Sequence, residues 1–250
     1  MTYVRAENVV VEFPIYGAQS RSLKNAFIRT ATGGLLAKDA AERIVVRALD
    51  NFSFTLNEGN RVGIVGHNGS GKTTLLRVIA GAYEPVHGSI EVAGRVASML
   101  SIHLGMDADA TGYENIFLRA AIMGLKPREI ESLVGEISEF SELGDYIDMP
   151  VRTYSSGMSM RLAFAISTCV SADIILMDEW LSVGDVAFRE KAQQRLRRLV
   201  DQAKILVLAS NDEGLIRGNC NRIMRLDHGK MVSFEDVNPG SLEPKVQEPR

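Results

Sequence analysis

The chain has 250 residues and a mass of 27.4 kDa, with 28 basic residues, 31 acidic residues and a hydrophobic share of 46%. A chain of this length can bury a sizeable core, and its composition excludes an intrinsically disordered protein. The net charge of −3 gives no overall electrostatic reason to expect binding to nucleic acid, so no nucleic-acid partner is predicted.

No segment of the sequence predicts a membrane-spanning helix. The longest strongly apolar run, Leu162 to Ala172, is shorter than the roughly 20 residues that a spanning helix needs. The first residues, Met1 to Glu7, lack the apolar core of a secretory signal. Cys169 and Cys220 have no metal-binding spacing, so we expect them to be reduced and structural in a soluble cytoplasmic protein.

Short apolar strands alternate with longer helical segments along the chain. Strands are predicted at Val4–Phe13, Phe52–Leu56, Arg61–Val65, Ile174–Met177 and Ile205–Ala209, followed by a hairpin of Arg222–Leu226 and Met231–Phe234. Helices are predicted at Gly71–Ala80, Glu114–Met123, Pro127–Phe140, Met158–Val170, Ala187–Ala203 and Asp212–Asn219. This order predicts an α/β fold with a mainly parallel core sheet, an antiparallel β subdomain and an inserted helical subdomain at about residues 112–170.

Two segments match no regular element. Residues 17–47 form a basic insertion whose local charge is +4, so the other residues together carry −7. Its basic residues are Arg21, Lys24, Arg29, Lys38, Arg43 and Arg47. Residues 238–250 contain three of the seven prolines and are predicted to be a disordered tail.

The run from Gly66 to Thr73 matches the phosphate-loop pattern G-x-x-x-x-G-K-[ST] at every fixed position. A predicted strand precedes it and a predicted helix follows, as this motif requires. The glycines allow successive backbone N–H groups to converge on a phosphate, and the helix N-terminus adds positive potential. We expect Lys72 to contact the β- and γ-phosphates of a nucleotide and Thr73 to ligate Mg²⁺. The nucleotide-binding set is Gly66, Asn68, Gly69, Ser70, Gly71, Lys72, Thr73 and Thr74.

A second motif ends the predicted strand Ile174–Met177, where Asp178 and Glu179 follow directly. Two carboxylates at the carboxyl end of a buried strand lie at the edge where α/β proteins bind ligands. Asp178 is expected to hold Mg²⁺ through water. Glu179 is expected to orient and partly deprotonate the attacking water, which makes Glu179 and Lys72 the predicted catalytic residues.

With these motifs the chain resembles an ATP-binding cassette (ABC) ATPase from about residue 3 to residue 238. Tyr154–Met158 stands where that family has its Leu-Ser-Gly-Gly-Gln signature; Ser155 and Gly157 match it, and Ser156 and Met158 depart from it. Ser182–Asp185 matches the D-loop of the family, with Asp185 as its acid.

The resemblance implies an ABC-type P-loop NTPase domain over residues 1–237, with ATP and Mg²⁺ as cofactors. It also implies a head-to-tail homodimer in which Ser155, Ser156 and Gly157 face the ATP held by the partner copy. An aromatic residue near the N-terminus commonly stacks on adenine in this family, and Phe13 and Tyr16 are the candidates.

Two positions depart from the family pattern. The family usually has a histidine after the strand that follows the D-loop, at what is called the switch position. This chain has Asn211 there, which can donate a neutral hydrogen bond to the γ-phosphate but carries no charge. We therefore expect slower hydrolysis. The expected glutamine loop, Ser98–Gly105, contains no glutamine. Ser101 or His103 could position metal or water there, and ordinary loop residues are the simpler interpretation.

Within this family, the chain looks like the ATPase subunit of bacterial polysaccharide exporters for O-antigen, capsule or teichoic acid. The resemblance is carried by Phe13–Gly17, Arg21–Lys24, Gly94–Leu100, Thr111–Ile116 and Tyr154–Met158. It implies a separate integral-membrane permease as partner, with a coupling helix docking near Ser98–Ala110, and a peripheral location on the cytoplasmic face of the bacterial inner membrane.

The lipid-linked polysaccharide would then contact this chain only indirectly. The basic insertion is either a solvated loop or a surface that places Arg21, Lys24 and Arg29 near anionic lipid or a pyrophosphate. Two alternatives for the function stay open: an ABC ATPase for another substrate such as a drug or lipid, and a weakly hydrolysing nucleotide-dependent scaffold.

Overall fold

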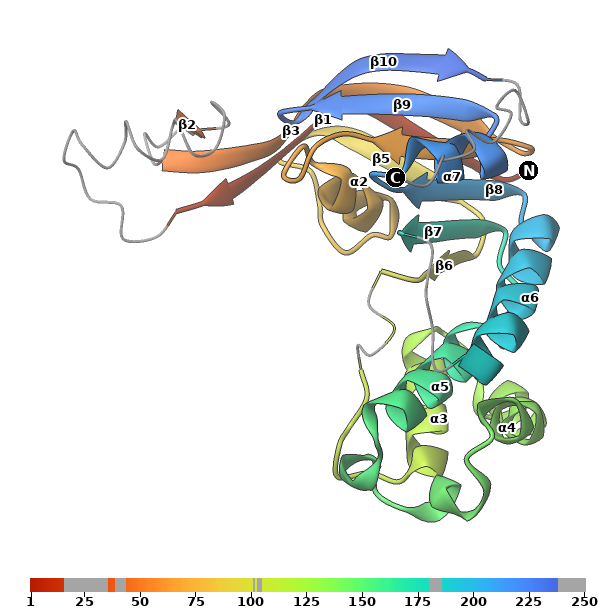
Figure 1. Cartoon of the computed structure of the whole chain (residues 1–250). Coiled ribbons are helices and arrows are strands. Elements are labelled where there is room, and N and C mark those ends of the chain that lie inside the picture. The colour runs from red at the N-terminus through yellow and green to blue at the C-terminus, as the bar shows by residue number, and fades with distance from the viewer. Residues whose placement is uncertain (16–35, 39–43, 101, 103–104, 180–185, 238–250) are drawn as a thin grey trace, which may run out of the picture. The chain divides into compact units, whose positions relative to one another are not determined.

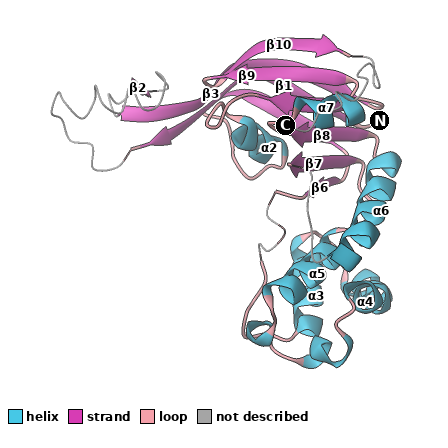
Figure 2. Cartoon of the chain, viewed as in Figure 1, coloured by secondary structure: helices cyan, strands magenta, loops and turns pink. Residues whose placement is uncertain are grey.

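The computed structural model describes residues 1–15, 36–38, 44–100, 102, 105–179 and 186–237. The chain divides into two compact units. Unit 1 comprises residues 1–94, 176–180 and 204–250, and unit 2 comprises residues 95–175 and 181–203. Most of the strands belong to unit 1, and most of the helices belong to unit 2 (Figure 2).

One sheet of unit 1 is antiparallel, with the strand order β2-β3-β1-β5 (Figure 1). Its strands are β1 (Tyr3–Pro14), β2 (Leu36–Lys38), β3 (Ile44–Asn57) and β5 (His87–Ala93). Val4 and Ala6 of β1 are buried and alternate with exposed residues, as predicted for a half-exposed strand. The alternation shifts by one residue at Asn8, which has a φ of 50°, and continues with the buried Val9.

The prediction that residues 17–47 contain no regular element is wrong at its C-terminal end. β3 begins at Ile44, and Val45 pairs with Pro14 of β1. The short strand β2 pairs with the same part of β3, with Lys38 opposite Ile44. The β-branched run from residue 44 to residue 46 favours an extended backbone, and the long partner strand β1 gives it a ladder to join.

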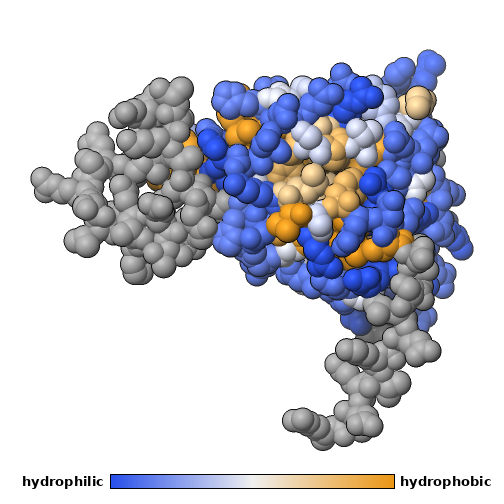
Figure 3. Space-filling view, turned by 90° about the horizontal axis from the view of Figure 1, so that it is seen from above, coloured by the Kyte–Doolittle hydropathy of each residue, from blue (hydrophilic) through white to orange (hydrophobic). Residues whose placement is uncertain are grey.

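The core sheet of unit 1 has the strand order β10-β9-β4-β8-β7. The strands are β4 (Arg61–Val65), β7 (Ile174–Asp178, of which residues 176–178 belong to this unit), β8 (Ile205–Ala209), β9 (Arg222–Asp227) and β10 (Lys230–Asp236). β4 runs parallel to both β8 and β9, so their carboxyl ends meet at one edge. The predicted parallel core sheet and C-terminal hairpin are confirmed. Viewed from the side of β10, apolar residues gather near the middle of the surface with hydrophilic residues around them (Figure 3).

Two helices of unit 1 were predicted and are present. α2 (Lys72–Ile79) buries Leu75 and Leu76. α7 (Glu213–Asn219) packs directly on β4, and glycine is needed at the contact. A Cβ at Gly63 would lie only 2.1 Å from Cγ2 of Ile216. Both helices begin just beyond the carboxyl edge of the core sheet.

Unit 2 is built from helices, and its core includes three aromatic rings. The elements are β6 (Val96–Ser98), α3 (Gly112–Ile122), α4 (Pro127–Ser141), α5 (Ser156–Ser167), α6 (Val186–Gln202) and the 3-10 turns η1 (Gly144–Asp148) and η2 (Val151–Thr153). Phe140, Phe164 and Phe188 pack with ring centroids 5.4 to 6.2 Å apart. The predicted helices of this region are confirmed. Among the described residues, no helix combines the length and the apolar character needed to cross a membrane.

Candidate nucleotide-binding site

The loop between β4 and α2 is packed so closely that glycine is required at both of its ends. A Cβ at Gly66 would lie 2.3 Å from the carbonyl oxygen of Leu226, and one at Gly71 would lie 2.7 Å from that of Ala48. Gly71 also has a φ of 107°, which residues with a side chain rarely adopt. The backbone thus curves tightly into the N-terminus of α2, where free N–H groups and the helix dipole favour an anion.

Ser70 lies inside this loop and is fully buried. Its carbonyl oxygen accepts a hydrogen bond of 3.0 Å from the N–H of Gly229, which fastens the loop to the turn between β9 and β10. Its hydroxyl has no hydrogen-bond partner among the described residues. A buried unpaired hydroxyl costs about 1–3 kcal/mol, so the loop holds a polar group that a bound ligand could satisfy.

Lys72 folds back over the loop that precedes it. Its Nζ donates hydrogen bonds to the carbonyl oxygens of Gly66 at 2.6 Å and His67 at 3.1 Å. Burial lowers the pKa of Lys72, and the carboxylates of Asp178 and Glu179 oppose that effect. Both carboxylates therefore act electrostatically on the ammonium group of Lys72, as expected if the three side chains share one site.

Thr73 joins the two predicted motifs. Its Oγ1 donates a hydrogen bond of 2.5 Å to Oδ2 of Asp178, at the end of β7. A hydroxyl and a carboxylate at this distance offer two oxygen ligands to one hard cation, and Mg²⁺ prefers oxygen ligands. The two residues predicted to hold the metal are thus in contact.

Glu179 follows Asp178 in an unusual backbone conformation. Its φ is 71°, which is uncommon for a residue with a side chain. Its N–H donates a hydrogen bond of 2.8 Å to the carbonyl oxygen of Ala209 at the end of β8. This bond holds the backbone at the end of β7, and the residue is exposed to solvent.

Asn211, the residue predicted for the switch position, lies next to the loop. Its Nδ2 donates a hydrogen bond of 3.2 Å to Oδ1 of Asn68. The next residue, Asp212, caps α7 by accepting hydrogen bonds from the N–H groups of Gly214 and Leu215. The cap fixes the chain just after Asn211 at the edge where β4 and β8 end.

Phe13 lies on β1 with 37% of its surface exposed. Its ring and that of Tyr83 pack in a T-shaped arrangement with centroids 5.2 Å apart, and the hydroxyl of Tyr83 accepts a hydrogen bond from Arg77 of α2. The stacking of Phe13 on adenine stays a prediction. Tyr83 was not identified from the sequence, because it follows α2 in a segment without a motif.

The predicted signature segment belongs to unit 2. Ser155 is the N-cap of α5, and its hydroxyl accepts a hydrogen bond of 3.2 Å from the N–H of Met158. Ser155 and Ser156 are exposed, and Gly157 is half-buried. The hydroxyl of Tyr154 donates a hydrogen bond of 2.6 Å to the carbonyl oxygen of Tyr146, which braces the segment before the helix.

Beside the phosphate loop, unit 1 has a groove of about 740 Å³ that the sequence did not reveal. Its wall includes Arg225, whose guanidinium is paired with Glu213 at 2.7 Å. Asp227 lines the groove as well. These residues follow no motif in the sequence, and only the pairing of β9 with β4 brings them to the loop.

Several predicted residues lie outside the described part of the chain. They are Asp185 of the D-loop, Tyr16, Ser101, His103, the tail 238–250 and the basic residues Arg21, Lys24 and Arg29.

Sequence comparisons identify relatives of this chain. Residues 49–182 match the family model described as "ABC transporter". The O-antigen export system ATP-binding protein RfbE of Yersinia enterocolitica is 47% identical over 92% of this chain and 96% of its own length. RfbB of Myxococcus xanthus, an O-antigen export system ATP-binding protein, is 39% identical over 83% of this chain and 47% of its own length. The teichoic acids export ATP-binding protein TagH of Lactococcus lactis is 36% identical over 94% of this chain and 50% of its own length.

Structural comparison agrees on the fold. The dimeric post-hydrolysis state of an ATP-binding cassette with ADP and phosphate has a TM-score of 0.66 and 21% identity, covering 94% of this chain and 99% of that one. The structure of an ATP-binding subunit of an ABC transporter also has a TM-score of 0.66, with 18% identity over 94% of this chain and 90% of that one. The predicted ABC-type fold is confirmed, and the chain belongs to the ABC transporter family, as one of its ATPases.

Proposed function

We propose that this chain is the ATP-hydrolysing subunit that energises export of a lipid-linked polysaccharide, of O-antigen or capsule type, through a separate membrane-spanning subunit. The substrate class rests on the relatives, which are named for O-antigen and teichoic acids export. The hydrolytic role rests above all on the hydrogen bond between Thr73 and Asp178, because it joins the phosphate loop to the end of the carboxylate-bearing strand.

The residues present fit ATP and Mg²⁺. The phosphate loop curves so tightly that a Cβ at Gly66 or at Gly71 would clash with a backbone carbonyl oxygen. The loop also contains the hydroxyl of Ser70, which has no hydrogen-bond partner among the described residues. Thr73 and Asp178 would hold Mg²⁺, which supplies positive charge to the phosphate oxygens when bound. Lys72 would exchange its hydrogen bonds to loop carbonyl oxygens for bonds to the β- and γ-phosphates.

Glu179 is the proposed general base for the attacking water. Water adds to the γ-phosphorus, the bond to the β–γ bridging oxygen breaks, and ADP leaves with that oxygen. Glu179 accepts the proton that the water loses. The exposed position of its carboxylate at the end of β7 leaves it accessible to water.

A second copy of this chain would complete the site. Ser155, Ser156 and Gly157 open helix α5, and a helix N-terminus binds anions well. In the proposed head-to-tail homodimer these residues contact the γ-phosphate held by the partner copy. A structural relative was solved as a dimer bound to ADP and phosphate, which supports the pairing of two copies.

The permease is proposed to dock on unit 2, at residues 98–110 and the adjoining helix α3. A groove of about 660 Å³ is lined there by aromatic and acidic side chains. Tyr113 and Leu118 are each 44% exposed, and the rings of Tyr113 and Phe117 lie 5.2 Å apart. An exposed apolar groove with acidic residues fits an amphipathic basic segment, and such docking would place this chain on the cytoplasmic face of the inner membrane.

The proposal is tested with purified protein and with cells. Wild-type protein should hydrolyse ATP in the presence of Mg²⁺, and Glu179→Gln should reduce kcat by about 10²-fold or more while ATP still binds. In cells that lack the gene, the wild type together with its permease should restore surface polysaccharide, and Glu179→Gln should not. Hydrolysis without any effect on surface polysaccharide would contradict the substrate class.

Asn211 keeps one other function open, that of a weakly hydrolysing scaffold. A neutral amide at the switch position cannot supply the charge of an imidazolium. The same ATPase assay separates the two functions. If neither the wild type nor Glu179→Gln hydrolyses ATP, although both bind it, the scaffold is favoured.

A further inference from the structure

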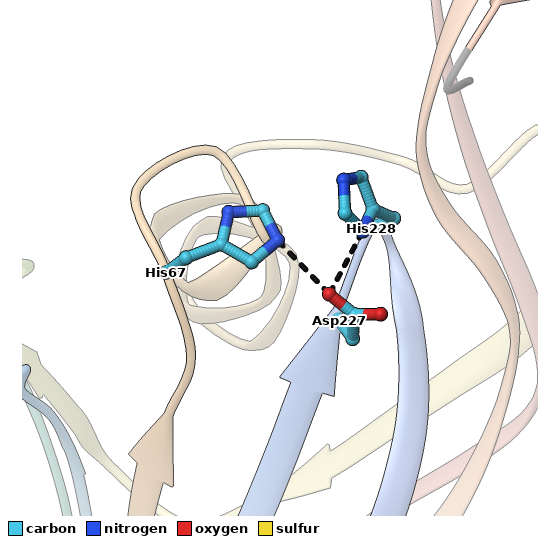
Figure 4. Close-up of side chains that lie close together, drawn as sticks. All are labelled: His67, Asp227 and His228. Atoms are coloured by element: carbon cyan, nitrogen blue, oxygen red, sulfur yellow. Dashed lines mark hydrogen bonds and ion pairs between the residues drawn. The ribbon is translucent and has the colours of Figure 1, made fainter. Parts of the chain in front are cut away.

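Three side chains meet beside the phosphate loop and have no part in the proposed hydrolysis. His67 comes from the loop itself, and Asp227 and His228 come from the turn between β9 and β10 (Figure 4). Nε2 of His67 lies 3.1 Å from Oδ1 of Asp227, and Nδ1 of His228 lies 2.8 Å from the same oxygen. One potential ligand atom from each residue falls within 4.8 Å of the other two.

The tautomer of His67 makes this contact informative. Its Nδ1 lies 2.8 Å from the carbonyl oxygen of Asn68, which can only accept a hydrogen bond, so Nδ1 carries the proton. In a neutral ring, Nε2 then presents a lone pair to the carboxylate of Asp227. Two acceptors 3.1 Å apart repel one another unless a cation lies between them. A second proton or a metal ion would remove the conflict.

Two of the three distances between the ligand atoms approach the spacing found around a metal ion. Zinc–nitrogen and zinc–oxygen bonds of about 2.0–2.2 Å at tetrahedral angles place two ligand atoms roughly 3.3 Å apart. The contacts of 3.1 Å and 2.8 Å around Asp227 need only a small opening to reach this spacing. The carbonyl that holds Nδ1 of His67 is also the usual partner of a metal-bound histidine, because it fixes the ring and leaves Nε2 free.

The backbone holds the cluster in place from both sides. His228 and Gly229 have φ values of 46° and 73°, the pattern of a tight hairpin turn with two left-handed residues. The N–H of Gly229 donates to the carbonyl oxygen of Ser70, so the turn is bonded to the phosphate loop. The side chains of His67, Asp227 and His228 are 45%, 56% and 42% exposed, so an ion could reach them from solvent.

We infer that His67, Asp227 and His228 form a binding site for a divalent transition metal of the zinc class, bridging the phosphate loop and the β9–β10 turn. Two imidazole nitrogens with one carboxylate favour such metals over Mg²⁺ and Ca²⁺, which prefer oxygen ligands. The site is separate from the Mg²⁺ position at Thr73 and Asp178. Three protein ligands leave at least one coordination position for water.

The test is titration of the untagged, metal-stripped, nucleotide-free full chain with Zn²⁺ by calorimetry. The wild type should bind one ion per chain. His228→Asn should weaken binding at least tenfold, since it removes a ligand, and Asn-Gly is a favoured pair in such a turn, so the fold should persist. Asp227→Asn should act in the same direction. Circular dichroism and the unfolding temperature without metal check that both variants are folded.

The chain provides a matched control because it has four histidines. The double variant His87→Ala/His103→Ala keeps only the two that belong to this cluster and should bind Zn²⁺ as the wild type does. Co²⁺ should give a visible ligand-field absorption in the wild type and in this control, and none in His228→Asn. Absence of saturable Zn²⁺ binding by the wild type, or equal binding by His228→Asn, would overturn the inference in favour of a protonated His67 paired with Asp227.

Discussion

The hydroxyl of Thr73 donates a 2.5 Å hydrogen bond to the carboxylate of Asp178, which lies 105 residues further along the chain. Thr73 is the second residue of α2, and Asp178 is the last residue of β7. The bond therefore ties the helix after the phosphate loop to the strand that ends directly before Glu179, the proposed general base. It also pairs the two oxygen ligands that Mg²⁺ would use.

Replacing Thr73 separates these two roles by experiment. Thr73→Val keeps the shape of the side chain and removes the hydroxyl, so the half-buried carboxylate loses a charged hydrogen bond. We expect the free energy of unfolding to fall by about 1–2 kcal/mol in urea denaturation without nucleotide. Mg²⁺-dependent ATP hydrolysis should fall at least tenfold. The control Thr73→Ser keeps the hydroxyl and should retain both properties to within about twofold in rate; equal loss in both variants would contradict a role for the hydroxyl.

Asn211 is predicted to limit the rate of hydrolysis. It donates to Asn68 of the loop, and a histidine at this position would add a group that can carry positive charge near the γ-phosphate. Asn211→His should raise kcat, by about tenfold if the added interaction is worth roughly 1.4 kcal/mol in the transition state. Steady-state ATPase kinetics measure this. Asn211→Ala is the control for loss of the amide and should not raise kcat, and an unaltered rate in Asn211→His would refute the prediction.

Ser155 has a structural role in unit 2 that can be separated from its proposed contact with ATP. Its hydroxyl caps α5, so Ser155→Ala should lower the free energy of unfolding by about 0.5–2 kcal/mol. Ser155→Asp keeps a good N-cap and places a negative charge at the position proposed to face the partner's γ-phosphate. Thermal unfolding should therefore show near-normal stability for Ser155→Asp, whereas its ATP hydrolysis should be largely lost. Full activity of Ser155→Asp would contradict the proposed dimer contact.

The sequence predicted the parts of the fold whose periodicity is strong. β8 is apolar throughout and β4 is apolar after Arg61, and the predicted bounds of both strands match the structure. β5 was missed because none of its side chains is fully buried, so its apolar residues form no pattern that distinguishes it from a loop. β6 has only three residues, too few to show a period.

In the candidate site too, residues in local sequence motifs could be predicted, whereas residues brought together by strand pairing could not. The phosphate loop and the Asp178–Glu179 pair are local motifs, and their residues proved to be neighbours. The cluster of His67, Asp227 and His228 depends on strand pairing between β4 and β9, which brings together residues 160 positions apart. Nothing in the local sequence around His228 distinguishes it from an ordinary turn residue.

The two cysteines give a prediction about pH. Burial raises the pKa of Cys169 to about 11 and that of Cys220 to about 12. In the unfolded chain both thiols ionise near their ordinary pKa of about 8.5, so the unfolded state loses protons first as the pH rises. Their contribution to stability is therefore complete below about pH 8.5 and is lost progressively as the pH rises toward 11 and 12.

The same burial predicts slow chemical modification of the two thiols. A thiol-specific disulfide reagent at pH 8 should label the native protein far more slowly than the urea-unfolded protein. Replacing Cys220 by Ala should flatten the decline in unfolding free energy between pH 8.5 and pH 10, whereas rapid labelling of native Cys220 would show that its thiol is not shielded by burial.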